Sequence, residues 1–538
     1  MNLIGELIDS NLTTKIFIFI FIIILSVINY FLFKAKKLIQ GLIIFASVHI
    51  LFGILLSFLS QYTPLVHFEI YMLPSVATGY LINFFADDSS DNKDKSPFLV
   101  PYNTDKGIIE IDLQKGLAIF GAAGSGKSRS GFVPIFKHAA ANRISLINYD
   151  YKDFELTEMM NYFYAKSDMP VYTISPARPD YSNCINPIDP KYLHGFADVN
   201  TIASVFISNL SSAGSGGDNR FFAETSEAGL AGIIWRLKED YPELCNIPYA
   251  ASIIMTKEFY DIGEFIKKSD NASLLAKPYL DSMGSDKQMA AVQATLTGSL
   301  RKVVSPEIFA IFSKSDFDLD INNVDNPRVL NLVNHPKYDT AYAPFLATTL
   351  RSALMQMSER GRNPTFINLD EASTFKLDKM SRIPATLRSY GIGTIFGLQD
   401  KVQGVQLYGE NELKAILTNL GSKILGKAND PDTSEYYQKL FELIQEDQKS
   451  ISKGTGWGGG EGERISISQR ERAKHRAFEF NLLKPGEFFI FDQFGKNTKV
   501  KFKEEYCEPT PTKAVYNYSK TELDLNFKNI IAHAKTLQ

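Results

Sequence analysis

The sequence predicts an α/β protein with a mainly parallel β-sheet, helices on both faces of the sheet, an inserted all-helical domain and N-terminal transmembrane helices. Three observations support this fold class. Short apolar segments alternate with helical segments from residue 107 onward, which is typical of a parallel sheet. Helical periodicity dominates residues 195–325, where strand signals are sparse. Long apolar runs occupy the first 86 residues.

The first 86 residues are expected to anchor the chain in a lipid bilayer. Residues 16–33 and 38–66 contain no Lys, Arg, Asp or Glu, and each run is long enough to cross a membrane. A third apolar run, residues 70–85, is shorter. Hydrophobicity favours two spans, whereas the three lysines between the first two runs favour three. Both arrangements predict a multi-pass membrane protein with a cytoplasmic body, joined to the anchor by a linker at residues 87–106.

A glycine-rich loop follows the apolar strand expected at residues 117–120. The loop and the start of the next helix have the pattern G-x-x-x-x-G-K-[ST], formed by Gly121, Ala122, Ala123, Gly124, Ser125, Gly126, Lys127 and Ser128. Backbone N–H groups of such a loop surround phosphate oxygens. Lys127 can reach the β- and γ-phosphates, and Ser128 can bind Mg²⁺. The segment therefore predicts a P-loop NTPase with a RecA-like core that binds ATP and Mg²⁺.

An acidic pair follows a second expected strand, residues 365–369. Asp370 is predicted to hold Mg²⁺, and Glu371 is predicted to act as the general base on the attacking water. Together with the phosphate loop, this pair predicts a Mg-dependent ATPase.

Two further polar residues border the strand expected at residues 392–398. Gln399 follows the strand and could contact the γ-phosphate or the water, or it could be an ordinary loop residue. Arg388 precedes the strand and could reach the nucleotide of a neighbouring subunit, or it could face solvent.

The composition excludes several kinds of site. The 538-residue chain has a formal charge of −3, so any contact with nucleic acid must come from a local patch. Its three cysteines are far apart, which excludes a disulfide framework or a zinc ribbon. One local patch, the basic cluster at residues 464–476, could contact a phosphate backbone or be a solvated surface.

The spacing of the motifs predicts that the nucleotide-binding domain is interrupted. Lys127 and Asp370 are 243 positions apart, which is far more than a minimal mononucleotide core needs. We expect a nucleotide-binding domain in two parts, residues 107–194 and 326–508, an all-helical insert at residues 195–325, and a C-terminal tail at residues 509–538.

Several further motifs, in this order, resemble those of the type IV secretion coupling proteins, the TraD/TraG-like conjugative ATPases. They are Asp150-Tyr-Lys152, Asn186-Pro187, residues 367–372, residues 388–409, residues 429–436 and residues 483–487. The resemblance implies a homo-oligomeric ring, a hexamer, in the bacterial inner membrane. It also implies that ATP hydrolysis delivers a DNA–relaxase complex, secreted effector proteins or both into a type IV secretion channel, in contact with the channel components.

Two alternatives remain open from the sequence. One is an FtsK-like double-stranded DNA translocase. The other is a substrate-docking receptor whose ATPase only gates the channel.

Overall fold

The structure, a computed structural model, describes residues 96–210, 217–455, 461–492 and 497–538. The chain divides into a unit of residues 1–96 and a unit of residues 97–538, and the description that follows concerns the second.

The membrane prediction concerns the N-terminal unit. The two or three spans expected within residues 1–86 lie outside the described residues. In the part of the chain that the structure describes, no helix is long and apolar enough to span a bilayer, so the predicted multi-pass localisation is wrong for this part. Helix α9 (Gly217–Asp240) shows the physical reason, because its 24 residues include charged side chains such as Glu224 and Glu227.

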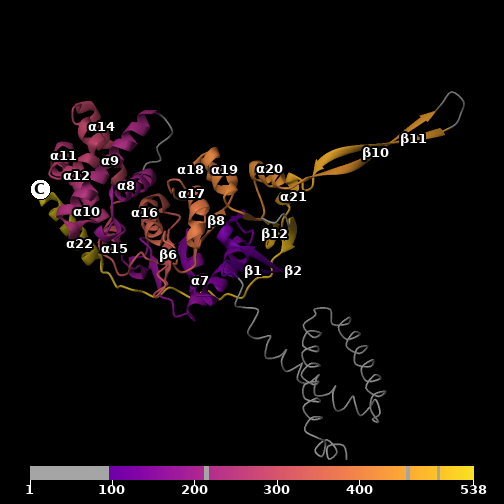
Figure 1. Ribbon diagram of the computed structural model, residues 1–538, viewed down its shortest axis with the longest axis horizontal. Helices are drawn as coiled ribbons and strands as arrows, with labels where there is room; N and C mark the ends of the chain where they lie inside the picture. The colour runs from indigo at the N-terminus through magenta and orange to yellow at the C-terminus, as the bar shows by residue number, and fades with distance from the viewer. Residues whose placement is uncertain (1–95, 211–216, 456–460, 493–496) are drawn as a thin grey trace, which may run out of the picture. The chain divides into compact units, whose positions relative to one another are not determined.

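A nine-stranded sheet forms the centre of the second unit, in the order β13-β12-β9-β3-β8-β7-β4-β6-β5 (Figure 1). Seven neighbouring strands are parallel: β9 (Ser422–Leu425), β3 (Leu117–Phe120), β8 (Ile392–Leu398), β7 (Thr365–Leu369), β4 (Ser145–Asp150), β6 (Val329–Val333) and β5 (Val171–Ile174). Two antiparallel strands, β12 (Glu487–Phe491) and β13 (Asn497–Lys501), extend the β9 edge. The predicted α/β class with a mainly parallel sheet is confirmed.

The sheet is buried on both faces. Every residue of β3, β4, β6, β7 and β8 is buried, as expected for parallel strands covered by helices. Successive residues belong to two different cores: Leu117 and Ile119 point to one, and Ala118 and Phe120 to the other.

One core lies under α6 (Val133–Ala141), α7 (Glu155–Tyr164) and the hairpin of β1 (Leu99–Thr104) and β2 (Gly107–Asp112). The other core lies under α16 (Asp339–Met357) and continues into a group of helices. That group is α8 (Phe196–Leu210), α9, α10 (Ile247–Thr256), α11 (Phe259–Lys267), α12 (Asp270–Leu275), α13 (Lys277–Ser282), α14 (Asp286–Leu300) and α15 (Pro306–Phe312).

Short helices follow the strands near the centre of the sheet, and a long hairpin separates two of them. The helices are α17 (Arg382–Thr386), α18 (Lys401–Tyr408), α19 (Glu410–Thr418), α20 (Pro431–Leu440) and α21 (Ala477–Asn481). The hairpin between α20 and α21 pairs β10 (Leu443–Thr455) with β11 (Glu461–Ala473) and is drawn in orange and yellow in Figure 1.

The C-terminal tail returns to the helical group. Its helix α22 (Lys520–Thr536) packs against α10 and α15, close to them in Figure 1. Phe309 of α15 contacts Phe527 with ring centroids 4.8 Å apart, and the Tyr241 hydroxyl donates to the Gln538 carbonyl at 2.9 Å. The tail is thus an integral part of the fold.

Candidate active site

The glycine-rich loop joins the end of β3 to a helix. After Phe120, residues 121–126 form the loop, and the turn η3 (Lys127–Phe132) continues directly into α6. Gly126 has φ +90°, and a Cβ there would lie 3.1 Å from the backbone nitrogen of Gly486. Glycine is therefore required at this position for two reasons, its left-handed conformation and the close approach of a neighbouring segment.

Neighbouring segments hold the loop in place. The Gly121 N–H donates to the Leu398 carbonyl at 3.1 Å, and the Ala122 N–H donates to the Lys427 carbonyl at 2.9 Å. The Ser125 carbonyl accepts from the Gly486 N–H at 2.9 Å. These bonds come from three different parts of the sequence, so the cradle is preformed by the tertiary structure.

The acidic pair lies beside the loop because β7 and β3 end at the same edge of the sheet, with β8 between them. The Lys127 Nζ lies 2.7 Å from Glu371 Oε1 and 3.2 Å from Asp370 Oδ1. Glu371 has φ +48°, in the left-handed region that non-glycine residues rarely adopt. Backbone strain of this kind is concentrated at functional sites.

The lysine and the two carboxylates of the site are buried together. Lys127, Asp370 and Glu371 are 5%, 1% and 6% exposed. Burial alone would lower the pKa of Lys127, but the attraction of the Asp370 and Glu371 carboxylates outweighs burial and raises it. Lys127 is therefore a fixed cation at neutral pH.

The acidic pair also fits a divalent cation. Asp370 Oδ2 and Glu371 Oε2 are buried and have no hydrogen-bond partner. Unpaired buried carboxylate oxygens are the hard ligands that Mg²⁺ prefers. In the described ranges no group of three or more His, Cys, Asp or Glu side chains could hold a metal ion. A magnesium ion at Asp370 and Ser128 would therefore need further ligands from a nucleotide or water.

Most of the predicted residues line a single cavity of about 440 Å³, whereas Asp370 lies behind its wall, in contact with Lys127. Its walls include all eight residues of the glycine-rich motif, together with Glu371 and Gln399. Gln399 faces this cavity because β8 ends between the loop strand and the acidic strand.

Arg388 does not join this cavity. It lies in the turn η7 (Leu387–Tyr390), is exposed, and precedes β8, whereas Gln399 follows that strand. A strand rises by about 3.3 Å per residue, so the seven residues of β8 separate Arg388 from the cavity edge of the sheet by roughly 20 Å. Arg388 cannot serve the nucleotide site of its own chain.

Four charged residues line the cavity that sequence analysis gave no role there, and one of them, Arg129, directly follows the glycine-rich motif. Lys152 and Glu155 follow β4, and Glu504 follows β13. Lys152 could have been found, because β4 is parallel to β7 and ends at the same edge. Glu504 had no comparable signal, because it reaches the cavity from a segment beyond an antiparallel edge strand.

Asp150 supports the Lys152 turn from inside the protein. Its carboxylate accepts from the Lys152 N–H at 3.0 Å and from the Thr157 N–H and hydroxyl, both at 2.8 Å. Burial raises the pKa of Asp150 to about 6, although the hydrogen bonds from Thr157 oppose the increase. This residue positions the turn that carries Lys152 into the cavity.

A parallel sheet, a glycine-rich loop that enters a helix, and an acidic strand separated from the loop strand by one other strand define a P-loop NTPase fold. The sequence model of the family described as "Type IV secretory system Conjugative DNA transfer" matches residues 96–487. The chain belongs to this family and is a type IV coupling protein of conjugative DNA transfer, which confirms the resemblance seen in its motifs.

Solved structures with a similar fold carry the name TrwB. The unbound bacterial conjugative coupling protein TrwBdeltaN70 is 15% identical, with a TM-score of 0.61 over 79% of this chain and 92% of that chain. Plasmid coupling protein TrwB in complex with ADP and Mg²⁺ is 13% identical, with a TM-score of 0.60 over 79% of this chain and 94% of that chain. Comparison with curated protein sequences gives no match.

Proposed function

We propose that this coupling protein binds ATP with Mg²⁺ in the cradle of residues 121–128 and hydrolyses it to drive DNA transfer. The observation that carries the proposal is the placement of Lys127, which lies buried at the loop within 3.2 Å of both carboxylates of the acidic strand. The similarity in fold to TrwB, solved with ADP and Mg²⁺, supports the same choice of ligands.

Each residue has a distinct task in this proposal. Lys127 turns from the carboxylates to the β- and γ-phosphates, Ser128 and Asp370 hold the metal, and Glu371 accepts a proton from the attacking water. Gln399, on the cavity wall, orients that water or the γ-phosphate. When bound, Mg²⁺ neutralises charge that develops on the phosphate oxygens.

We also propose that the protein acts as a ring, with six subunits as the expected number. Arg388 is exposed and lies roughly 20 Å from its own cavity, so it can contribute to hydrolysis only at a neighbour's site. A ring provides such a neighbour for every subunit.

The cargo we propose is single-stranded DNA with its relaxase, delivered to the components of a type IV secretion channel. Stimulation of ATP hydrolysis by single-stranded DNA tests this assignment. Stimulation by double-stranded DNA alone would favour an FtsK-like translocase, and stimulation by a secreted protein alone would favour a docking receptor.

The experiment that tests hydrolysis compares Lys127→Ala with Lys528→Ala in the purified full-length protein. Lys528 is an exposed lysine on α22, remote in sequence from the loop, and serves as the control. We expect Lys127→Ala to lower phosphate release by at least about 10²–10³-fold, as for other lost electrostatic contacts to a transition state. Equal rates in the two variants would contradict the proposed site.

A further inference from the structure

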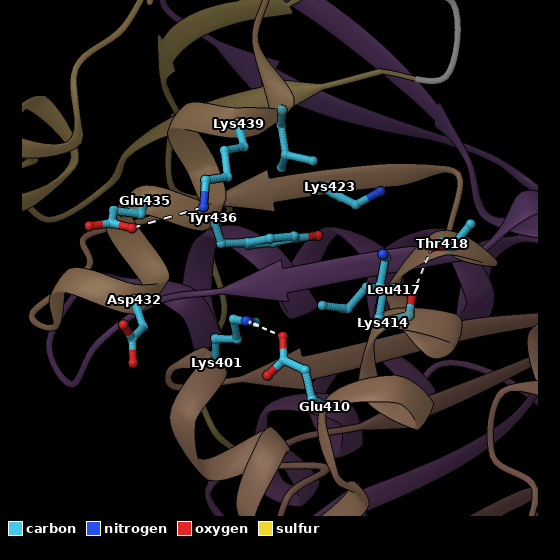
Figure 2. Close-up of a pocket in the computed structure, with 11 residues that line it drawn as sticks. Lys401, Glu410, Lys414, Leu417, Thr418, Lys423, Asp432, Glu435, Tyr436 and Lys439 are labelled. Atoms are coloured by element: carbon cyan, nitrogen blue, oxygen red, sulfur yellow. Dashed lines mark hydrogen bonds and ion pairs between the residues drawn. The ribbon is translucent and has the colours of Figure 1, made fainter.

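A second cavity, of about 470 Å³, lies on the same side of β9 as α18, α19 and α20 (Figure 2). It shares no lining residue with the nucleotide cavity. Its walls are rich in lysine, with Lys401, Lys414, Lys423 and Lys439.

Two of these lysines are neutralised within the cavity wall. Lys401 lies 2.7 Å from Glu410, and Lys439 lies 3.9 Å from Glu435. Lys414 and Lys423 have no acidic partner within 4.0 Å in the part of the chain that the structure describes. The four lysines share the cavity wall with three carboxylates, because Asp432 lines it beside Glu410 and Glu435. The wall therefore has one excess positive charge, and Lys414 and Lys423 are the two lysines outside its ion pairs.

Lys423 is an unusual cation because it is a strand residue, 7% exposed. Its ammonium donates to the Leu420 carbonyl at 3.0 Å and lies 5.3 Å from the centroid of the Phe491 ring. Of its three N–H groups, one is used by this carbonyl, and no carboxylate accepts from the others in the described residues. Burial lowers the pKa of Lys423 to about 8. An anion in the cavity would supply both the missing acceptor and the missing charge.

We propose that this cavity binds a phosphate group of single-stranded DNA, held by Lys414 and Lys423 beside the ring of Tyr436. Figure 2 shows the hydroxyl end of Tyr436 directed toward the side of the cavity where these two lysines lie. Lysines with an adjacent aromatic ring are the combination that binds single strands without sequence preference. The inference rests on the proposed DNA cargo, and it adds the residues that contact the strand.

The location of the cavity links it to hydrolysis. The Tyr436 ring packs against Phe120, the residue before the glycine-rich loop, with centroids 5.8 Å apart. The Lys401 N–H donates to the Thr433 hydroxyl at 2.8 Å, and Lys401 lies two positions after Gln399. A DNA strand in this cavity would therefore contact α20, which packs against the residue before the phosphate loop. It would also contact α18, which begins two positions after Gln399.

The test measures binding of a fluorescent oligothymidylate to the full-length protein over a range of salt concentrations. The variants are Lys414→Gln and Lys423→Met, and Lys528→Gln on α22 removes the same charge elsewhere as the matched control. Each lost phosphate contact should make the negative slope of log affinity against log salt shallower by about 0.7. At 0.1 M salt this change corresponds to binding that is about fivefold weaker. The DNA concentration for half-maximal stimulation of ATP hydrolysis should rise in parallel.

Two results would overturn the inference. One is that Lys414→Gln and Lys423→Met bind the oligonucleotide with the affinity and salt slope of the Lys528→Gln control. The other is that inorganic phosphate binds in a lysine-dependent way while DNA binding is unchanged, which would make this a site for a small phosphate. Wild-type protein that hydrolyses no ATP, or binds no DNA, would instead contradict the proposed function.

Discussion

Replacement of Lys127 by methionine should destabilise the nucleotide-free protein by about 3–5 kcal/mol, in addition to stopping hydrolysis. Methionine keeps most of the apolar side chain but removes the charge. It leaves Asp370 and Glu371 without the cation that both contact, and these residues are only 1% and 6% exposed. Burial of an uncompensated charge is the costly outcome when one partner of an ion pair is removed.

The magnitude follows from the two distances. At an effective dielectric constant of about 20, attraction over 2.7 Å and 3.2 Å amounts to about 6 and 5 kcal/mol. Much of this attraction only offsets the desolvation of three buried charges, so the cost of losing Lys127 is smaller than the sum. Because the folded-state pKa of Lys127 is raised, its contribution is fully present below its unfolded pKa of about 10.4. It is lost only as the pH rises through the folded value, so Lys127 itself adds no pH dependence to the difference below about pH 9.

Urea unfolding followed by far-UV circular dichroism measures this difference. The control is the triple variant Lys127→Met, Asp370→Asn, Glu371→Gln, which removes all three charges and should regain most of the lost stability. A single variant as stable as wild type, or a triple variant no more stable than the single one, would refute the reasoning.

Four further changes have defined outcomes. Glu371→Gln should slow hydrolysis about 10²–10⁴-fold yet bind ATP more tightly, because a competing carboxylate is removed from Lys127; an unchanged rate in a phosphate-release assay would contradict its role as the base. Arg388→Ala should hydrolyse ATP about 10³–10⁵-fold more slowly, with partial rescue when it is mixed with Lys127→Ala, and a failure of rescue at every ratio would speak against action in trans. Lys423→Met should stabilise the protein by up to about 3 kcal/mol at pH 7. The reason is that the pKa of Lys423 is lowered in the folded protein, so its buried charge destabilises the fold below about pH 8. This cost disappears as the pH rises toward 10.4, the pKa of an unfolded lysine. The urea midpoints of wild type and variant should therefore differ at pH 7 and converge at pH 10. Gly126→Ala should weaken nucleotide binding measured by calorimetry, because φ +90° and the nearby Gly486 backbone disfavour a Cβ, whereas the same change at the open position Gly298 should have no effect.

The central strands were predictable because burial on both faces leaves a simple pattern. β3, β7 and β8 have the bounds expected from the sequence, and each is a short, mostly apolar run bordered by glycine, proline or polar residues. The edge strands were harder to predict, because β12 and β13 have antiparallel partners that hydrophobic periodicity cannot specify.

The candidate site was predictable only where a motif and the rule for strand ends agree. The glycine-rich loop, Asp370, Glu371 and Gln399 follow parallel strands, so their proximity follows from topology. The same rule could have assigned Lys152, which follows β4. Lys423 could not be found in this way, because its burial depends on α19 and α20, which pack over β9 only in the folded chain.

The C-terminal tail, together with the residues from β12 onward that precede it, shows what neither local pattern nor family resemblance could supply. Residues 488–538 lie beyond the part of the chain that matches the family, yet they contact both halves of the body. Glu504 lines the nucleotide cavity, the Thr510 N–H donates to the Glu158 carbonyl of α7 at 2.9 Å, and the Tyr516 hydroxyl donates to Asp316 at 2.6 Å.

A sequence signal for the last part of this tail exists, but it is only local. Ser519 and Glu522 form a reciprocal capping box, which indicates where α22 begins and says nothing about what the helix packs against. Its partners, α10 and α15, lie more than 200 positions earlier in the chain. The position of α22 is therefore set by its tertiary contacts with α10 and α15, which a local capping signal cannot specify.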